Sequence, residues 1–213
     1  MPTTIGPRHA STSASNSCFG SLWEELRRKE EEGIRKWDKD PLSSSLLPLP
    51  SMTLGILSDT HGYFHPALAE YLAGVDLILH AGDVGREEIL DRLEALAPTR
   101  AVWGNIDGPE VRRRTPEHQC FDLDGLSFWM THIAGRPGRW QRGMGRALSQ
   151  QTPDVFVCGH SHILQIERVA SLGGMLFINP GAAGRQGLHQ VKTCVRLVLE
   201  DGTPQQAEVI HLD

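Results

Sequence analysis

Short apolar runs, separated by helical stretches and glycine turns, fill the chain from Met52 to its C-terminus. Runs of roughly four to eight apolar and β-branched residues between turn residues predict strands, and apolar residues three and four positions apart predict helices. On this basis we expect strands at 53–58, 75–80, 100–103, 119–121, 126–131, 155–158, 163–169, 175–178, 193–199 and 206–212, and helices at 66–72, 86–96 and 139–150.

The first half of this pattern contains two strand–helix units. Since a strand that follows such a unit normally pairs in parallel through a right-handed crossover, parallel pairing is the economical topology here. The later half is mostly β. The pattern therefore indicates an α/β domain with a β-rich C-terminal part.

Residues 1–51 differ in composition from the rest of the chain. They combine a Ser/Thr-rich opening, a charged run at 23–37 and a Pro-rich stretch at 41–50. We expect a poorly ordered N-terminal extension over 1–51 and the catalytic domain over 52–213. Two origins of the extension stay open: a start assigned too early, with Met52 as the true initiator, or a targeting segment, since residues 1–23 contain no acidic residue.

Composition and charge narrow the class of protein. Hydrophobic residues make up 39% and charged residues 22%, which excludes collagen-like, coiled-coil and wholly disordered chains. Lys and Arg number 21 against 26 Asp and Glu, a net charge of −5, so no general positive field holds nucleic acid or an anionic membrane. A long nucleic acid is therefore not an expected partner, and the oligomeric state, including a homo-oligomer, stays open.

Cysteine spacing and the lack of long apolar runs point to the cytoplasm. The four cysteines form no CxxC pair and no disulfide framework, as expected in a reducing compartment. No apolar run reaches the roughly 18 to 20 residues of a membrane-spanning helix. We expect a cytoplasmic protein that does not cross a membrane, with its cysteines unpaired: Cys18, Cys120, Cys158 and Cys194.

Six short polar motifs carry the candidate chemistry, and five of them directly follow predicted strands. Because strand ends of an α/β sheet present side chains to a shared crevice, residues far apart in sequence can converge there. Their side chains are of metal-ligand types. The motifs are Asp59-Thr60-His61, Gly82-Asp83, Gly104-Asn105-Ile106-Asp107, Thr131-His132, Gly159-His160-Ser161-His162 and Asn179-Pro180-Gly181.

In order, placement and chemistry, these motifs resemble those of the calcineurin-like metallophosphoesterases, particularly the small YfcE-like branch that also contains the retromer-subunit fold. The resemblance covers about residues 52–213. It implies two mixed β-sheets packed face to face as a sandwich flanked by helices, the four-layer αββα metallophosphoesterase fold.

The resemblance also implies two divalent metal ions, most often manganese, with iron, zinc, cobalt and nickel left open. Two cations sharing a water would lower its pKa from about 15.7 toward neutrality, and the resulting hydroxide would attack the phosphorus in line. Asn105 would also contact the substrate. The implied ligands, which are also the implied catalytic residues, are Asp59, His61, Asp83 and His162 for one metal, and the bridging Asp83 with Asn105, His132 and His160 for the other.

Two positions depart from the pattern of the larger superfamily. Ile106 stands where a histidine often helps to protonate the leaving oxygen, so we expect slow hydrolysis of alkyl esters and faster hydrolysis of aryl phosphodiesters. Ala182 replaces a serine after Asn179-Pro180-Gly181, a segment for which a tight structural turn is expected. His80 fits either a residue that orients a ligand or a hydrogen-bonded core histidine.

Four arginines follow the candidate ligand His132 in a glycine-rich stretch without acidic residues. Because a guanidinium pairs well with phosphate oxygens, we expect Arg136 and Arg139 to bind the substrate phosphate, with a solvated helix face as the alternative. The other two are Arg142 and Arg146.

The preferred function is a metal-dependent phosphodiesterase acting on a small phosphate ester. Two alternatives stay open: a phosphomonoesterase, and a non-catalytic scaffold like the retromer subunit of the same fold. The complete ligand set argues against the scaffold, and the lack of a long basic track argues against a nuclease.

Overall fold

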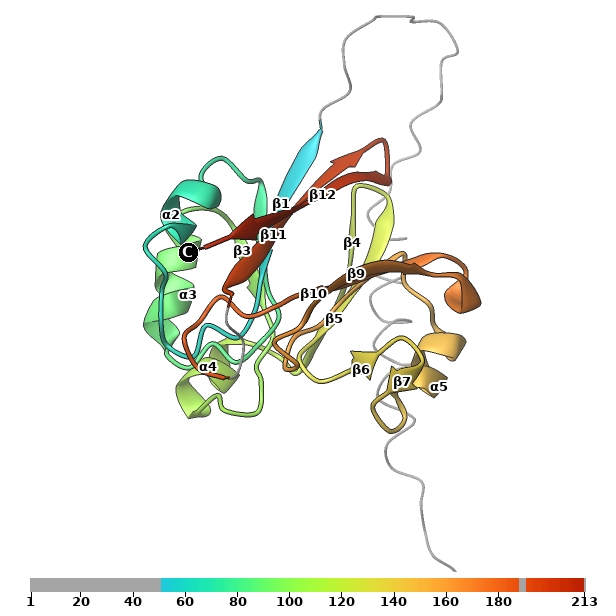
Figure 1. Ribbon diagram of the computed structural model, residues 1–213, viewed down its shortest axis with the longest axis horizontal. Helices are drawn as coiled ribbons and strands as arrows, with labels where there is room; N and C mark the ends of the chain where they lie inside the picture. The colour runs from blue at the N-terminus through green and yellow to red at the C-terminus, as the bar shows by residue number, and fades with distance from the viewer. Residues whose placement is uncertain (1–50, 188–190, 213) are drawn as a thin grey trace, which may run out of the picture. The chain divides into compact units, whose positions relative to one another are not determined.

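The computed structural model describes residues 51–187 and 191–212. The extension expected over 1–51 therefore lies outside the described residues, apart from Ser51. Within the described part, two five-stranded sheets pack face to face, and helices cover their outer faces (Figure 1).

The first sheet has the strand order β12-β11-β1-β2-β3. Its centre is the expected parallel unit, in which β1 pairs with β2 and β2 with β3. The C-terminal hairpin adds two antiparallel strands beside β1. The strands are β1 (Met52–Leu57), β2 (Leu77–His80), β3 (Thr99–Ala101), β11 (Thr193–Glu200) and β12 (Thr203–His211).

The second sheet has the order β4-β5-β8-β10-β9. Strand β8 pairs in parallel with both of its neighbours, and the two edge strands are antiparallel. Both sheets are therefore mixed, as expected. The strands are β4 (His118–Leu123), β5 (Leu126–Thr131), β8 (Val155–Val157), β9 (Leu164–Val169) and β10 (Met175–Pro180).

Alternation along the strands explains the layers. In β1, Leu54 and Ile56 face the core between the two sheets, and Leu57 faces the helical side, because successive side chains of a strand point to opposite faces. In β2, Leu79 likewise faces the core between the two sheets, and Ile78 faces the helical side. These strands are thus apolar on both faces, as buried strands between two layers must be.

Helices α2 (Leu68–Tyr71), α3 (Glu87–Glu94) and α4 (Pro109–Arg114) cover the outer face of the first sheet. Helix α5 (Met144–Gln150) covers the outer face of the second through Leu148, which packs with Phe156 and Phe177. A short 3-10 helix, η1 (Ala170–Leu172), precedes β10. The expected four-layer αββα fold is confirmed.

The helix expected at 139–150 is wrong in its first part. Residues 139 and 140 instead form β7 (Arg139–Trp140), which pairs with β6 (Gly135–Arg136) in a small hairpin. Gly138 and Gly143 have φ values of 79° and 88°, which turn the chain before α5 begins. Helix α4 was not expected; Pro109 occupies its first turn, where a proline needs no amide hydrogen.

No helix in residues 51–187 and 191–212 is long and apolar enough to cross a membrane.

Candidate metal centre

The candidate ligands sit in the loops that follow five strands, where the ends of both sheets meet. Asp59 and His61 follow β1, Asp83 follows β2, and Asn105 follows β3. From the second sheet, His132 follows β5, and His160 and His162 lie between β8 and β9. Strand ends thus bring together residues that are more than a hundred positions apart.

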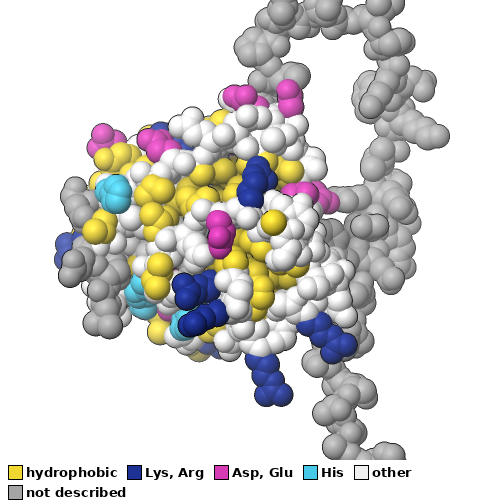
Figure 2. Space-filling model, turned by 45° about the vertical axis from the view of Figure 1, so that its right-hand side comes forward, with side chains coloured by type: hydrophobic (Ala, Val, Ile, Leu, Met, Phe, Trp, Pro, Cys, Tyr) yellow, Lys and Arg dark blue, Asp and Glu magenta, His cyan; other side chains and the backbone are white. Residues whose placement is uncertain are grey.

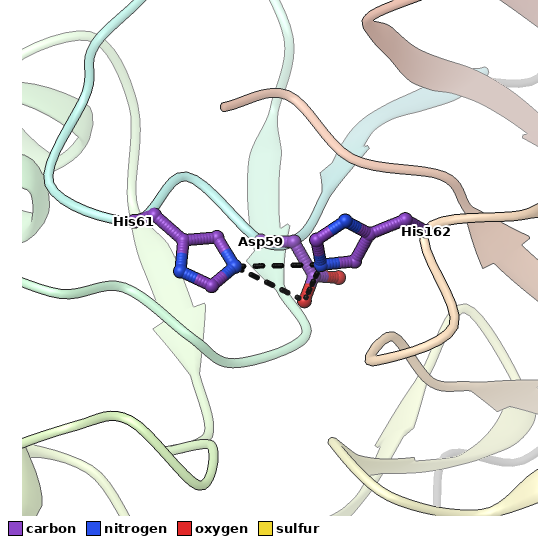
Figure 3. Close-up of side chains that lie close together, drawn as sticks. All are labelled: Asp59, His61 and His162. Atoms are coloured by element: carbon purple, nitrogen blue, oxygen red, sulfur yellow. Dashed lines mark hydrogen bonds and ion pairs between the residues drawn. The ribbon is translucent and has the colours of Figure 1, made fainter. Parts of the chain in front are cut away.

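One group consists of Asp59, His61 and His162, whose candidate ligand atoms all lie within 4.8 Å of one another. His162 Nε2 lies 3.1 Å from Asp59 Oδ1, and His61 Nε2 lies 3.9 Å from the same oxygen. The two imidazole Nε2 atoms are 3.4 Å apart. Figure 3 shows the three side chains pointing toward one point.

A second group consists of Asp83, His132 and His160, again within 4.8 Å. His132 Nε2 lies 3.2 Å from Asp83 Oδ1, and His61 Nε2 of the first group lies 3.7 Å from Asp83 Oδ2. One carboxylate oxygen of Asp83 thus faces the first group, and the other faces the second group. Asn105 lines the pocket next to the second group together with His132.

Polar atoms buried at the centre fit a cation. Asp59 Oδ1 and His132 Nε2 are buried and have no hydrogen bond of acceptable geometry in the described part of the chain, although imidazole nitrogens lie 3.1–3.9 Å from Asp59 Oδ1. His132 Nδ1 lies 2.7 Å from the carbonyl oxygen of Ala81, to which it donates. In the neutral imidazole, Nε2 therefore carries a lone pair toward a carboxylate oxygen, and a proton or a cation must lie between them.

The pKa shifts in the metal-free centre follow from burial and from these carboxylates. Burial lowers the pKa of His132, but Asp83, Asp59 and the Ala81 carbonyl together more than compensate, so the net shift of this pKa is upward. Contact with Asp59 raises the pKa of His162. Burial would raise the pKa of Asp83, yet His132 holds it below its usual value. Burial lowers the pKa of His160.

The backbone at these ligands lies in a region that few non-glycine residues adopt. Among the described residues, seven non-glycine residues have positive φ, and five of them are candidate ligands. Such conformations cost free energy, cluster at functional sites and persist only where surrounding contacts hold them. The five are Asp59 (54°), His61 (49°), Asp83 (54°), His160 (68°) and His162 (57°).

Contacts behind the ligands hold these loops. His80 is fully buried, with Nε2 2.9 Å from Thr60 Oγ1 and Nδ1 accepting from the Gly82 amide at 3.2 Å. Thr60 Oγ1 donates to the Val84 carbonyl at 3.1 Å. His80 is thus a hydrogen-bonded core histidine, and through Thr60 and Gly82 it joins the loop after β1 to the loop after β2.

Sequence reasoning missed the role of Asp107, which was noted only as the last residue of the Gly104-Asn105-Ile106-Asp107 motif. Its buried carboxylate accepts three backbone N–H groups: Gly104 at 2.7 Å, Val84 at 3.1 Å and Gly85 at 2.6 Å. Ile106 instead is 46% exposed, and its amide donates to Asp83 Oδ1 at 3.1 Å. The closeness of Asp107 to the Gly104-Asn105 motif was the available clue.

Asn179 supports the histidine loop, in keeping with the structural role expected for its turn. Its Nδ2 donates to the Gly159 carbonyl at 2.9 Å and to Ser161 Oγ at 3.0 Å. The two candidate ligands His160 and His162 flank Ser161, so this amide fixes the loop that carries both.

The structure places Arg136 and Arg139 opposite each other in the β6–β7 hairpin, and both are exposed. Neither lines the pocket next to Asn105 and His132. Arg142, from the same glycine-rich stretch, does line it.

Comparison with known proteins agrees with this fold and shows the family of the chain. Residues 52–202 match the calcineurin-like phosphoesterase superfamily domain. Over 168 residues the chain is 32% identical to a protein of Methanothermobacter thermautotrophicus named "Probable metallophosphoesterase", an overlap of 75% of this chain and 92% of that one. A "Probable metallophosphoesterase" of Methanocaldococcus jannaschii is 32% identical over 138 residues, 62% of this chain and 68% of that one.

Among solved structures, vacuolar protein sorting 29 from Cryptosporidium parvum superposes with a TM-score of 0.59 at 18% identity, over 76% of this chain and 97% of that one. At this identity the likeness concerns the fold. The αββα sandwich is that of a metallophosphoesterase. The chain belongs to the calcineurin-like phosphoesterase superfamily.

Proposed function

We propose that this protein is a dinuclear metal-dependent phosphodiesterase whose metallophosphoesterase domain spans residues 52–213. The observation that carries the proposal is the position of Asp83, which has one carboxylate oxygen 3.7 Å from His61 and the other 3.2 Å from His132. One carboxylate can thus serve both groups of candidate ligands, as expected of a bridging ligand.

The first metal would be held by Asp59, His61, Asp83 and His162, and the second by Asp83, Asn105, His132 and His160. Divalent ions held there would supply Lewis-acid activation of water and charge neutralisation for the phosphoryl group. Imidazole and oxygen donors suit manganese, iron, zinc, cobalt or nickel better than calcium, and manganese is the ion we propose.

The protein's own residues orient this centre. The hydrogen bond from His132 Nδ1 to the Ala81 carbonyl fixes the ring so that Nε2 faces Asp83. Asp59 Oδ2 accepts the His160 amide at 3.0 Å, which fixes the carboxylate while Oδ1 faces the imidazoles. Asn105 lines the adjoining pocket beside His132, which supports a role for it in contacting a phosphoryl oxygen as well as a metal.

A diester is the favoured substrate because the pocket holds little positive charge. Arg142 is the one Lys or Arg side chain among the residues that line it, and Glu117 lines it too. A monoester dianion would gain more from a cluster of cations than a monoanionic diester does. On the face in Figure 2, Lys and Arg side chains stand singly or in small groups, so that face offers no continuous basic track for a long nucleic acid.

The test is hydrolysis of bis(p-nitrophenyl) phosphate, p-nitrophenyl phosphate and a cyclic nucleotide with and without MnCl2. We expect manganese-dependent hydrolysis of the diester, faster than that of the monoester, and a loss of about a hundredfold or more in Asp83→Asn. Asp122→Asn, which changes an exposed carboxylate of β4, should keep full activity. Manganese-loaded protein that hydrolyses none of these esters would contradict the proposal and favour a scaffold.

A further inference from the structure

A pocket of about 300 Å³ adjoins the second group of candidate ligands. Asn105 and His132 form part of its wall. An ester whose phosphoryl group lies at these two residues can therefore place one of its substituents in this pocket. The inference below rests on the proposed function, because it assumes that the phosphoryl group binds at the metal centre.

Apolar side chains from three separate segments line the pocket: Trp103 after β3, Ile133 after β5 and Met144 at the start of α5. The guanidinium carbon of Arg112 lies 4.3 Å from the centre of the Trp103 ring, which fixes the indole from one side. Met144 packs against the outer core of the second sheet. Trp103 and Met144 are thus anchored in the fold. The thioether of a methionine also contacts aromatic rings favourably.

Polar groups stand at the rim. Gln141, Arg142 and Glu117 line the pocket and are exposed. Backbone hydrogen bonds hold the segment that carries the first two, since the Gln141 amide donates to Ala134 at 2.8 Å and the Met144 amide donates to Gln141 at 2.9 Å. A guanidinium can stack on an aromatic face or bond to a polar ring edge.

We propose that this pocket binds an aromatic or heterocyclic ring in the organic group of the ester. Apolar walls with a hydrogen-bonding rim suit a flat ring with polar edges, and the volume, at the lower end of the usual range for ligand pockets, suits one compact ring-bearing group. The substrate class is then a phosphate ester with such a group, and Gln141 and Met144 determine specificity for the ring.

The test compares two non-hydrolysable probes, phenylphosphonate and methylphosphonate, by calorimetric titration of the full-length protein in MnCl2. Burying a ring predicts that phenylphosphonate binds about tenfold or more tightly than methylphosphonate. Gln141→Trp places a bulky side chain at the pocket and should reduce that preference to about threefold or less, while the affinity for methylphosphonate stays within about twofold. Gln150→Trp, at an exposed glutamine of α5 outside the pocket, is the matched control and should keep the preference.

Met144→Ala gives a second measurement, which does not require the protein to fold with a tryptophan at position 141. This variant should also bind phenylphosphonate with a reduced preference over methylphosphonate. Equal affinity for the two probes in the wild type would overturn the inference, as would a preference unchanged in both variants. Hydrolysis of bis(p-nitrophenyl) phosphate is measured in parallel. Its absence counts against the proposed function, whereas hydrolysis without a phenyl preference counts against the ring pocket alone.

Discussion

The carboxylate of Asp107 accepts a 2.6 Å hydrogen bond from the backbone amide of Gly85. Gly85 lies in the loop after β2 and Asp107 in the loop after β3, so the contact joins the loop that carries Asp83 to the loop that carries Asn105. The two candidate ligands on these loops are thus held by a residue that is not itself a candidate ligand.

Asp107→Ala should destabilise the domain. The substitution leaves three backbone N–H groups without their acceptor, and buried donors left unpaired cost about 1–3 kcal/mol each, so we expect a loss of about 3 kcal/mol or more. The free energy of unfolding, measured in urea on metal-free protein, checks this. Asp122→Ala, at an exposed position of β4, should change stability by less than about 0.5 kcal/mol. Similar values for both variants would show that Asp107 does not brace the loops.

His80 should make the metal-free domain less stable in mild acid. Burial lowers its pKa from 6.5 to about 4, so the folded state keeps the imidazole neutral while the unfolded chain takes up a proton. The stability that the folded state gains by keeping His80 neutral is fully present above pH 6.5 and is lost as the pH falls toward 4. Between pH 7 and pH 5 the loss amounts to about 2 kcal/mol.

Urea unfolding of wild type and His80→Gln at both pH values isolates this contribution, because His132 and His162, whose pKa values are raised, act in the opposite direction in both proteins. The variant should lose about 2 kcal/mol less than the wild type on acidification. His211→Gln, at an exposed position of β12, should behave as the wild type does. A wild-type-like pH dependence in His80→Gln would refute this prediction.

Gly104→Ala should weaken metal binding. A Cβ atom at this position would overlap Asp83 Oδ1 and lie 2.7 Å from His132 Cδ2, so both candidate ligands must move. We expect manganese affinity to fall about tenfold or more, as measured by equilibrium dialysis. Gly108→Ala, four residues further on, meets only Glu110 Oε2, at 3.1 Å, and serves as the control. Equal affinities in the two variants would show that the close approach at Gly104 is unimportant.

Much of the fold was predictable because its strands are buried between layers. The runs at 53–58 and 126–131 became β1 and β5 with nearly the expected bounds, since buried strands must be apolar on both faces. The stretch 139–150 was misread because arginines and methionine fit a helical pattern, while positive φ at Gly138 and Gly143 starts the helix late.

The candidate ligands were predictable as residue types at strand ends, and the structure brings six of the seven into two adjacent groups, while Asn105 lines the pocket beside the second group. Sequence does not reveal that five of them have positive φ, nor that Asp107 binds backbone amides, because both depend on how the loops of neighbouring strands meet. Arg142 lines the pocket in place of Arg136 and Arg139, because the hairpin holds those two in β6 and β7.

Ile106→His should speed hydrolysis of alkyl diesters. Residue 106 follows Asn105 and bonds to Asp83 through its amide, and its side chain is 46% exposed, so a histidine fits there and can protonate a poor leaving group. We expect kcat to rise about tenfold or more for an alkyl diester and to change little for bis(p-nitrophenyl) phosphate. Ile163→His, at an isoleucine that is 62% exposed and follows His162, is the matched control. The same change on both esters would contradict general-acid help at position 106.

The most direct test of the metal centre is the number of manganese ions bound per chain, measured by equilibrium dialysis at pH 8, because protons compete with metal ions for imidazole ligands at lower pH. The account predicts two ions in the wild type and at most one in Asp83→Asn, with hydrolysis of bis(p-nitrophenyl) phosphate lost in the variant. A single ion or none in an active wild-type protein, or two ions retained in Asp83→Asn with full activity, would contradict it.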